Sequence, residues 1–299
     1  MMAGSDGRLV AVIGASGTVG RHVVAQLAGQ VRVRVILRTP LADPLPEGVT
    51  AVMADMTSTS GLAQAMAGAD ALFVGIGTTP DLARIEGRFV AAAAQARVQR
   101  IVRISAPDIP SVAVSRWHGA VETLLADSGV AHVNIRPTAF MQNWLRNAAP
   151  IRLTGRITGS AGDGARNYVD ARDVAACAVR SVLADTLQPG QRVQIVAGPD
   201  AVNHPEMAMR LSFVTGHRVR YVDLTDAAHL RLLKGRAGLP DWLAHHVVEL
   251  DTLARTTPEL PSDSLRDLLG RAPRTMDEFL TEHRHVFRRP WFLRMARLG

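Results

Sequence analysis

The sequence predicts an α/β fold in which a doubly wound parallel sheet is joined to a smaller, mainly helical C-terminal part. Two observations predict the sheet. Short apolar, β-branched runs alternate with helix-length amphipathic segments over residues 8–137, and a glycine-rich turn follows the first run. A third observation, the loss of this rhythm after Pro137, predicts the second part.

The elements follow in a regular order. Strands are expected at 8–14, 31–37, 50–54, 71–76, 100–105 and 131–137, and helices at 19–28, 60–67, 82–96 and 116–128. Beyond Pro137 we expect a strand at 165–169, a helix capped by Asp170 or Asp173, and a strand at 191–198. Further helices follow, one with Pro205 in its first turn and one over 240–254.

Composition limits the environment of the chain. Its 299 residues are 47% hydrophobic, enough for a full core. The single cysteine, Cys177, excludes an intrachain disulfide and suits a reducing cytoplasm. No apolar run approaches the length of a membrane span, and the N-terminus lacks the apolar segment of a signal peptide. We therefore expect a cytoplasmic protein without a membrane span.

The net charge of +7 is concentrated at the C-terminus, where five arginines and one glutamate follow Thr281. This tail mixes arginine with Trp291, Phe292 and Leu293, so it could bind an anionic surface or a partner. Pro290 interrupts any long amphipathic helix, which favours a terminal helix packed on the body. No helix-turn-helix is visible, and we expect no contact with DNA.

The turn after the first strand, GASGTVG, places glycines at positions 14, 17 and 20 before a helix. Glycine permits a tight turn and a close approach to phosphate, and the helix N-terminus offers N–H groups to an anion. This context predicts a dinucleotide site. The expected binding residues in this turn are Gly14, Ser16, Gly17, Thr18, Val19 and Gly20.

The end of the second strand indicates which dinucleotide binds. An NAD site usually has an acidic residue there, whereas this chain has Arg38 and no acid before Asp43. Arginine can clamp a 2′-phosphate, so we expect NADPH or NADP as the cofactor. Asp55 and Met56 are expected beside the adenine, although the role of Asp55 could be limited to forming a turn. Gly75, near the end of the fourth strand, is also expected beside the cofactor.

The Tyr and Lys of short-chain reductases, spaced YxxxK, are absent. Tyr168 is followed four positions later by Arg172, Tyr221 by Thr225, and the only lysine is Lys234. The Tyr/Lys dyad is therefore absent from this sequence, which agrees with an acceptor that needs little acid assistance.

Several segments together carry a family resemblance: GASGTVGRHVV, LRTP, SRWHGAVETLLADSG, NIRPTAFMQNW, YVDARDVA and GRAPRTMDEFLTEHRHVF. They resemble the NmrA-like branch of atypical short-chain dehydrogenases over nearly the whole chain. The resemblance implies a Rossmann fold that prefers NADPH and carries a small C-terminal substrate domain. It also implies either a quinone or triphenylmethane-dye reductase or a regulator that binds the dinucleotide without turnover.

The resemblance also bears on RWHGAVETLL, in which His118 and Glu122 share a helix face. Relatives with the lysine place it where His118 stands, which leaves Val114 at the tyrosine position, and quinone-reducing relatives carry His and Glu at this spacing. We expect His118, Glu122 and Ser105 to be the catalytic residues, and Glu122 could form a hydrogen bond with His118 and raise its pKa. The alternative is that Glu122 anchors a loop and His118 packs beside Trp117.

The sixth strand leads into the expected pocket. Pro137 and Thr138 are expected to contact the nicotinamide, and the expected substrate-pocket residues are Phe140, Met141, Asn143, Trp144 and Tyr168. The AFMQNW segment could equally pack in the core. The histidine groups lack a zinc pattern, so no metal is expected.

These observations predict an NADPH-dependent reductase that transfers hydride to a quinone or another conjugated, electron-poor small molecule, with a homodimer possible. Residues 1–150, with sheet additions from about 165–198, should form the NADP-binding domain, and residues 199–299 the substrate domain. One alternative is a non-catalytic NADP(H) sensor that acts through a protein partner. Another is an isomerase or cyclase that uses His118 and Glu122.

Overall fold

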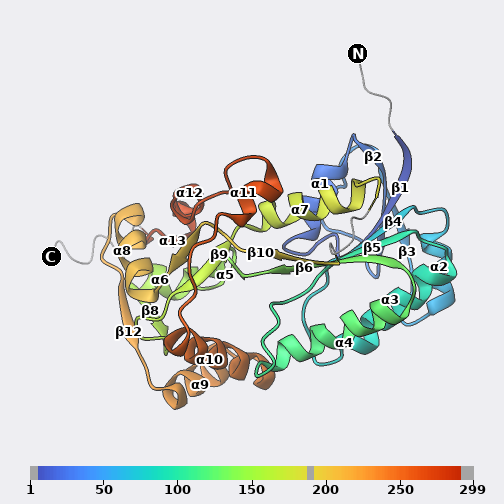
Figure 1. The fold of residues 1–299 in the computed structure, drawn as a ribbon. Helices are drawn as coiled ribbons and strands as arrows, with labels where there is room; N and C mark the ends of the chain where they lie inside the picture. Colours follow the sequence, from blue (N-terminus) through green and yellow to red (C-terminus); the bar gives the residue numbers. More distant parts are fainter. Residues whose placement is uncertain (1–5, 187–191, 291–299) are drawn as a thin grey trace. The chain divides into compact units, whose positions relative to one another are not determined.

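The computed structural model describes residues 6–186 and 192–290, coloured by position in the chain in Figure 1. The chain forms two compact units: Met1–Pro137 with Ala171–Val196, and Thr138–Asp170 with Ala197–Gly299. This division differs from the predicted domains, because residues 138–150 and 165–170 belong to the second unit and not to the nucleotide-binding one.

The first unit is built on a seven-stranded sheet in the order β10-β6-β5-β4-β1-β2-β3, in which every pair of neighbours is parallel. Its strands are β1 (Asp6–Ile13), β2 (Val31–Leu37), β3 (Val49–Met53), β4 (Ala71–Val74), β5 (Arg100–Ile104), β6 (Ala131–Pro137) and β10 (Val193–Val196). The predicted doubly wound Rossmann sheet is confirmed.

The strand order reverses at β1. The chain moves from β1 through β2 to β3 on one side, and then returns to place β4, β5 and β6 on the other. The carboxyl ends of β1 and β4 therefore flank the switch point, where open α/β sheets bind their ligands.

Helices cover both faces of this sheet (Figure 1). They are α1 (Gly20–Leu27), α2 (Thr59–Met66), α3 (Leu82–Gln95), α4 (Ala113–Asp127) and α7 (Ala171–Leu183). α1 packs beside α7, which also carries the buried Cys177, whereas α2, α3 and α4 pack in sequence on the other face. The core under α2–α4 includes Leu72, Phe89 and Leu125. The strands read as nearly continuous apolar runs because both faces are covered.

The second unit is mainly helical and contains small sheets. β11 (Asp200–Val202) pairs antiparallel with β9 (Arg166–Val169), β9 pairs in parallel with β7 (Ala139–Phe140), and β8 (Arg156–Gly159) pairs in parallel with β12 (Arg220–Asp223). The helices are α5 (Asn143–Arg146), α6 (Ala148–Thr154), α8 (His204–Thr215), α9 (Asp226–Gly235), α10 (Asp241–Thr256), α11 (Ser264–Leu269), α12 (Met276–Glu282) and α13 (Arg284–Phe287).

Local signals explain where two of these helices begin. Asn203 caps α8 by accepting a hydrogen bond from the backbone N–H of Glu206, and Pro205 lies in the first turn as predicted. Thr275 and Glu278 form a reciprocal capping box at the start of α12. Part of the predicted basic tail lies outside the described residues, namely Trp291, Phe292, Leu293, Arg294 and Arg297.

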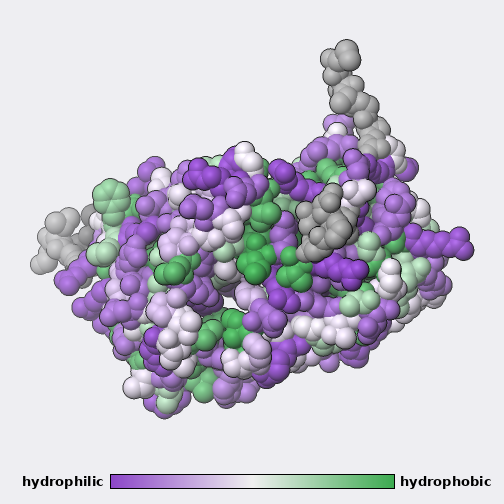
Figure 2. Space-filling model, in the orientation of Figure 1, coloured by the Kyte–Doolittle hydropathy of each residue, from purple (hydrophilic) through white to green (hydrophobic). Residues whose placement is uncertain are grey.

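Apolar side chains on the face drawn in Figure 2 are interrupted by hydrophilic ones. α8 exposes Met209 and Phe213, one helical turn apart. Among the helices in the described ranges, none combines the length and the hydropathy that a bilayer crossing requires.

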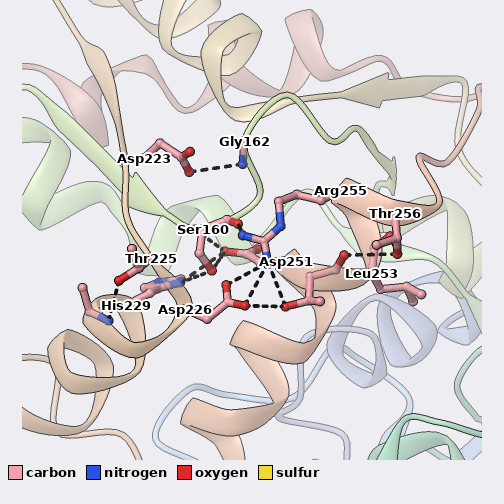
Figure 3. Close-up of polar contacts among 12 residues, drawn as sticks. Ser160, Gly162, Asp223, Thr225, Asp226, His229, Asp251, Leu253, Arg255 and Thr256 are labelled. Carbon is pink, nitrogen blue, oxygen red and sulfur yellow. Dashed lines mark hydrogen bonds and ion pairs between the residues drawn. The ribbon is translucent and has the colours of Figure 1, made fainter.

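Polar contacts tie three elements of the second unit together (Figure 3). Asp251 of α10 accepts hydrogen bonds from the backbone N–H of Ser160, at 2.8 Å, and from Nδ1 of His229 in α9, at 3.2 Å. Arg255 donates to the Ser160 carbonyl at 2.6 Å and to both carboxylate oxygens of Asp226. We call Ser160, Asp226, His229, Asp251 and Arg255 the α9–α10 clasp, because together they hold both helices to the loop after β8.

The charge of Asp251 is stabilised within this clasp. Burial alone would raise the pKa of the carboxyl, but the hydrogen bonds from His229 and from the Ser160 backbone outweigh it and hold the pKa below its ordinary value. A carboxyl with a lowered folded-state pKa stabilises the protein above its unfolded-state pKa, and this stabilisation is lost as the pH falls through the folded-state value.

Replacing Asp251 with Asn should therefore lower the free energy of unfolding of the full chain by about 1–3 kcal/mol at pH 7, because buried donors lose a charged acceptor. The difference from wild type should begin to shrink below about pH 4, where the carboxyl becomes protonated in the unfolded chain, and should vanish as the pH falls through the lower folded-state pKa. Urea denaturation at both pH values measures this. Asp163→Asn, at an exposed position in the same loop, is the control and should change little. A pH-independent difference would contradict the assigned role of the charge.

Candidate functional site

The turn between β1 and α1 is a close-packed glycine cradle. Gly14 has a φ of +88°, and a Cβ there would lie 2.3 Å from the Gly75 carbonyl oxygen. A Cβ at Gly20 would lie 2.0 Å from the Gly14 oxygen, and Gly17 donates its N–H to that same oxygen at 2.9 Å. The backbone therefore occupies the space in which any side chain would stand, and the turn can approach a bound phosphate closely.

The helix that follows is suited to an anion. α1 begins at Gly20 with Val19 at its N-cap, and no side chain caps it. The N-terminal N–H groups of a helix have no intrahelical acceptor, and the helix dipole favours negative charge there. The cradle and the uncapped helix together fit the pyrophosphate of a dinucleotide. Within the turn, Ser16 is exposed, Thr18 is half-buried and Val19 is buried.

The predicted adenine-side residues lie at the carboxyl ends of neighbouring strands. Arg38 follows β2 and is exposed, and Asp55 and Met56 follow β3, which pairs with β2. Asp55 accepts hydrogen bonds from the backbone N–H and the hydroxyl of Thr57, at 2.8 and 2.7 Å, and the hydroxyl contact is the larger cause of its lowered pKa. Asp55 thus forms the turn that the sequence offered as its alternative role.

His118 and Glu122, one turn apart on α4, belong to a buried polar network. Glu122 accepts a hydrogen bond from the Ser105 hydroxyl at 2.5 Å and a forked pair from Arg136 at 3.0 and 2.5 Å. His118 faces Arg103 through Nδ1, at 3.0 Å, and Thr78 through Nε2, at 3.1 Å. The expected direct bond from Glu122 to His118 is thus replaced by a path through Ser105 and Arg103, since Arg103 also donates to Ser105 at 3.2 Å.

The charges within this network differ in environment. Burial would raise the pKa of Glu122, but the hydrogen bonds from Arg136 and Ser105 hold it below its ordinary value. For Glu86, which accepts from Arg103 Nε at 2.8 Å, burial dominates and raises the pKa despite the guanidinium. At neutral pH, Glu122 is therefore an anion that anchors Arg136 and Ser105 and is a poor proton donor.

Sequence reasoning overlooked Arg103, Glu86, Arg136 and Thr78. Arg103 stands inside the apolar run of β5, and Glu86 interrupts the buried stripe of α3 between Leu82 and Phe89. A charged side chain at a core position needs a partner of opposite charge. The presence of Arg103 and Glu86 within apolar segments could therefore have predicted a buried ion pair.

The remaining predicted residues are divided between the units. Pro137 ends β6 in the first unit, whereas Thr138 begins the second and donates to the Asn167 side chain at 2.8 Å. Met141, Trp144 and Tyr168 lie in the core of the second unit, where the Trp144 and Tyr168 rings pack 6.0 Å apart. This is the packing role that the sequence left open for AFMQNW. Phe140 is half-buried and Asn143 is exposed.

The α9–α10 clasp contains a serine, a histidine and an aspartate, but it lacks the geometry of a hydrolytic triad. In a triad, one imidazole nitrogen faces the serine and the other the acid. Here Ser160 and Asp251 both face Nδ1 of His229, at 3.2 Å each, and all three side chains are buried. Among the described residues, no group of three or more His, Cys, Asp or Glu side chains is placed to hold a metal.

The doubly wound sheet and the glycine turn indicate a dinucleotide-binding protein, and comparison with known proteins agrees with this class. Residues 14–186 match a family model described as NAD(P)H-binding. An NAD(P)H azoreductase of Xenophilus azovorans is 32% identical over 93% of this chain and 99% of its own length. A (4-alkanoyl-5-oxo-2,5-dihydrofuran-3-yl)methyl phosphate reductase of Streptomyces griseus is 33% identical over 93% of this chain and 99% of its own length.

The fold has counterparts among solved structures. An NADPH-dependent quinone oxidoreductase of Escherichia coli, solved with NADPH, superposes with a TM-score of 0.82 at 27% identity over 92% of this chain and 99% of that one. The transcriptional regulator NmrA, solved with NADP, superposes with a TM-score of 0.74 at 16% identity, and the match covers 92% of this chain and 95% of that one. At this identity the similarity concerns the fold alone.

The chain belongs to the NAD(P)H-binding family. The expected NmrA-like fold is confirmed, and so is the expected class, an NAD(P)H-dependent oxidoreductase that lacks the Tyr/Lys dyad.

Substituting Gly20 with Ala should weaken NAD(P)H binding by about tenfold or more, because the new methyl group collides with the Gly14 oxygen and deforms the cradle. Fluorescence titration with NADPH measures the dissociation constant. Gly7→Ala, in β1 with open space around its Cβ, is the matched control. Equal affinities in the two variants would show that the cradle does not hold the cofactor.

Proposed function

We propose that the chain is an NADPH-dependent reductase whose acceptor is a quinone or another conjugated, electron-poor small molecule. The observation that carries the proposal is the glycine cradle, placed at the switch point of the sheet next to a polar network without tyrosine or lysine. Bound NADPH would supply a hydride. The residues of this chain would bind the cofactor, orient its rings and hold polar groups at the carboxyl edge of the sheet.

The preference for NADPH rests on Arg38. Its guanidinium follows β2 directly and is exposed, and no acidic residue occupies the end of that strand. A guanidinium can form paired, charge-assisted hydrogen bonds with a 2′-phosphate, whereas NADH offers only a hydroxyl.

The choice of acceptor rests on the missing acid. Carbonyl reduction leaves an alkoxide that needs a proton donor, and at the corresponding positions on α4 this chain has Val114 and His118. A quinone or an enone spreads the negative charge left by hydride over a conjugated system, so water can supply the proton. The names of the relatives agree with such acceptors: an azo group, a 5-oxo-2,5-dihydrofuran and a quinone.

His118, Glu122 and Ser105 would serve this reaction by position. Glu122 would fix Ser105 and Arg136 at the ends of β5 and β6, and His118 would present a ring nitrogen beside the loop after β4. The test is NADPH oxidation with a panel of quinones, enones and azo dyes. Turnover supports the reductase, whereas tight binding of NADPH without turnover on any acceptor would replace it with a dinucleotide-sensing regulator.

Replacing Arg38 with Gln should raise the KM for NADPH by about ten- to a hundredfold, which corresponds to the free energy of one pair of charge-assisted hydrogen bonds. The KM for NADH should stay nearly unchanged. Initial rates with both cofactors at a fixed quinone concentration measure this. Arg32→Gln serves as the control, because Arg32 lies in β2 and donates a hydrogen bond to the Gly7 carbonyl. A parallel loss with NADH would show that Arg38 does not read the 2′-phosphate.

A further inference from the structure

Arg103 is an arginine in the interior of the first unit. Its side chain is 1% exposed, and it lies on β5 between apolar neighbours. A buried guanidinium is stable only when its charge is balanced and its N–H groups find acceptors. Glu86 of α3 supplies the balancing charge at 2.8 Å and is itself 3% exposed.

The other N–H groups of Arg103 reach three elements. Nη1 lies 3.2 Å from the Ser105 hydroxyl and 3.4 Å from the Asn134 side-chain oxygen, and Nη2 lies 3.0 Å from Nδ1 of His118. Because arginine only donates, Nδ1 of His118 must offer a lone pair in this contact. The ring proton of His118 then resides on Nε2, which faces the Thr78 hydroxyl at 3.1 Å.

We infer that Arg103 and Glu86 are positioning residues that hold His118 as the neutral imidazole with its proton on Nε2. The pair thereby makes His118 a hydrogen-bond donor toward the loop after β4, and it disfavours the imidazolium form that acid catalysis would need. A second proton on Nδ1 would place an N–H against the Arg103 guanidinium and break the contact. Glu122 is engaged by Ser105 and Arg136, so it does not offset this effect as the partner of His118.

The tautomer of His118 is inferred from its contacts with Arg103 and Thr78, without reference to any ligand. That the Nε2 proton meets a ligand rests on the proposed function, because it assumes a cofactor or acceptor beside the Thr78 loop. The two statements can therefore fail separately.

The tautomer is tested by long-range ¹H–¹⁵N correlation spectra of the full-length protein labelled on histidine nitrogen, at pH 7. The His118 signals are assigned by their absence from His118→Gln. The inference expects one protonated nitrogen, Nε2, and an unprotonated Nδ1. An imidazolium pattern, or a proton on Nδ1, would overturn it whatever the activity of the protein.

The role of Arg103 is tested with Arg103→Lys, which keeps a cation beside Glu86 but cannot also reach His118. The fixed Nε2–H pattern should give way to exchange between tautomers or to protonation, and an unchanged pattern would overturn the role of Arg103. If Arg103→Lys does not fold, Arg103→Met combined with Glu86→Leu removes both charges together, and the same readout applies.

Turnover gives an independent measure. His118→Gln keeps an oxygen that can accept from Arg103 and an N–H on the Thr78 side, so its kcat/KM should stay within about tenfold of the wild-type value. The kcat/KM of His118→Leu, which keeps neither group, should be lower still. If His118 were a general acid, both variants would lose about 10²–10⁴-fold, and this outcome would overturn the inference. If the wild-type protein turned over no acceptor, the proposed function would fail while the spectra still decided the tautomer.

Discussion

The close approach of two backbone turns, one after β1 and one after β4, organises the first unit. The Gly75 oxygen occupies the place of a side chain at Gly14, so both turns are fixed at the switch point of the sheet. The first turn leads into α1 and its uncapped N-terminus. The second carries Thr78 to His118, and through that ring the contact reaches Arg103 and Glu86. The glycine turn and the buried polar network are thus connected along one edge of the sheet.

Much of this edge is encoded locally and could be predicted. The six strands predicted before Pro137, the helices between them and the glycine spacing are all patterns within short windows of sequence, and the structure contains them in the predicted order. Arg38 was also placed correctly at the end of β2, because that position follows from counting along the strand.

The partners of His118 and Glu122 could not be predicted in the same way. Helical spacing shows that the two residues share a face of α4, but it does not show what that face meets. Their partners come from β5, from β6 and from the residues that follow β4 and β5, and the geometry of the sheet selects them. The division into units was missed for a related reason. The chain passes between the units at Pro137 and Thr138 without a linker, and only packing shows that Met141 and Trp144 belong to the second core.

The uncapped start of α1 also has a thermodynamic consequence. A helix whose first N–H groups receive no side-chain acceptor leaves part of its stabilisation to whatever anion binds there. A dinucleotide phosphate would therefore act as the missing cap, and the stability of the folded chain would be linked to the cofactor supply. At a free concentration a hundred times the dissociation constant, this linkage adds about 2.7 kcal/mol. The resistance of the protein to proteolysis inside a cell would then follow the size of the dinucleotide pool.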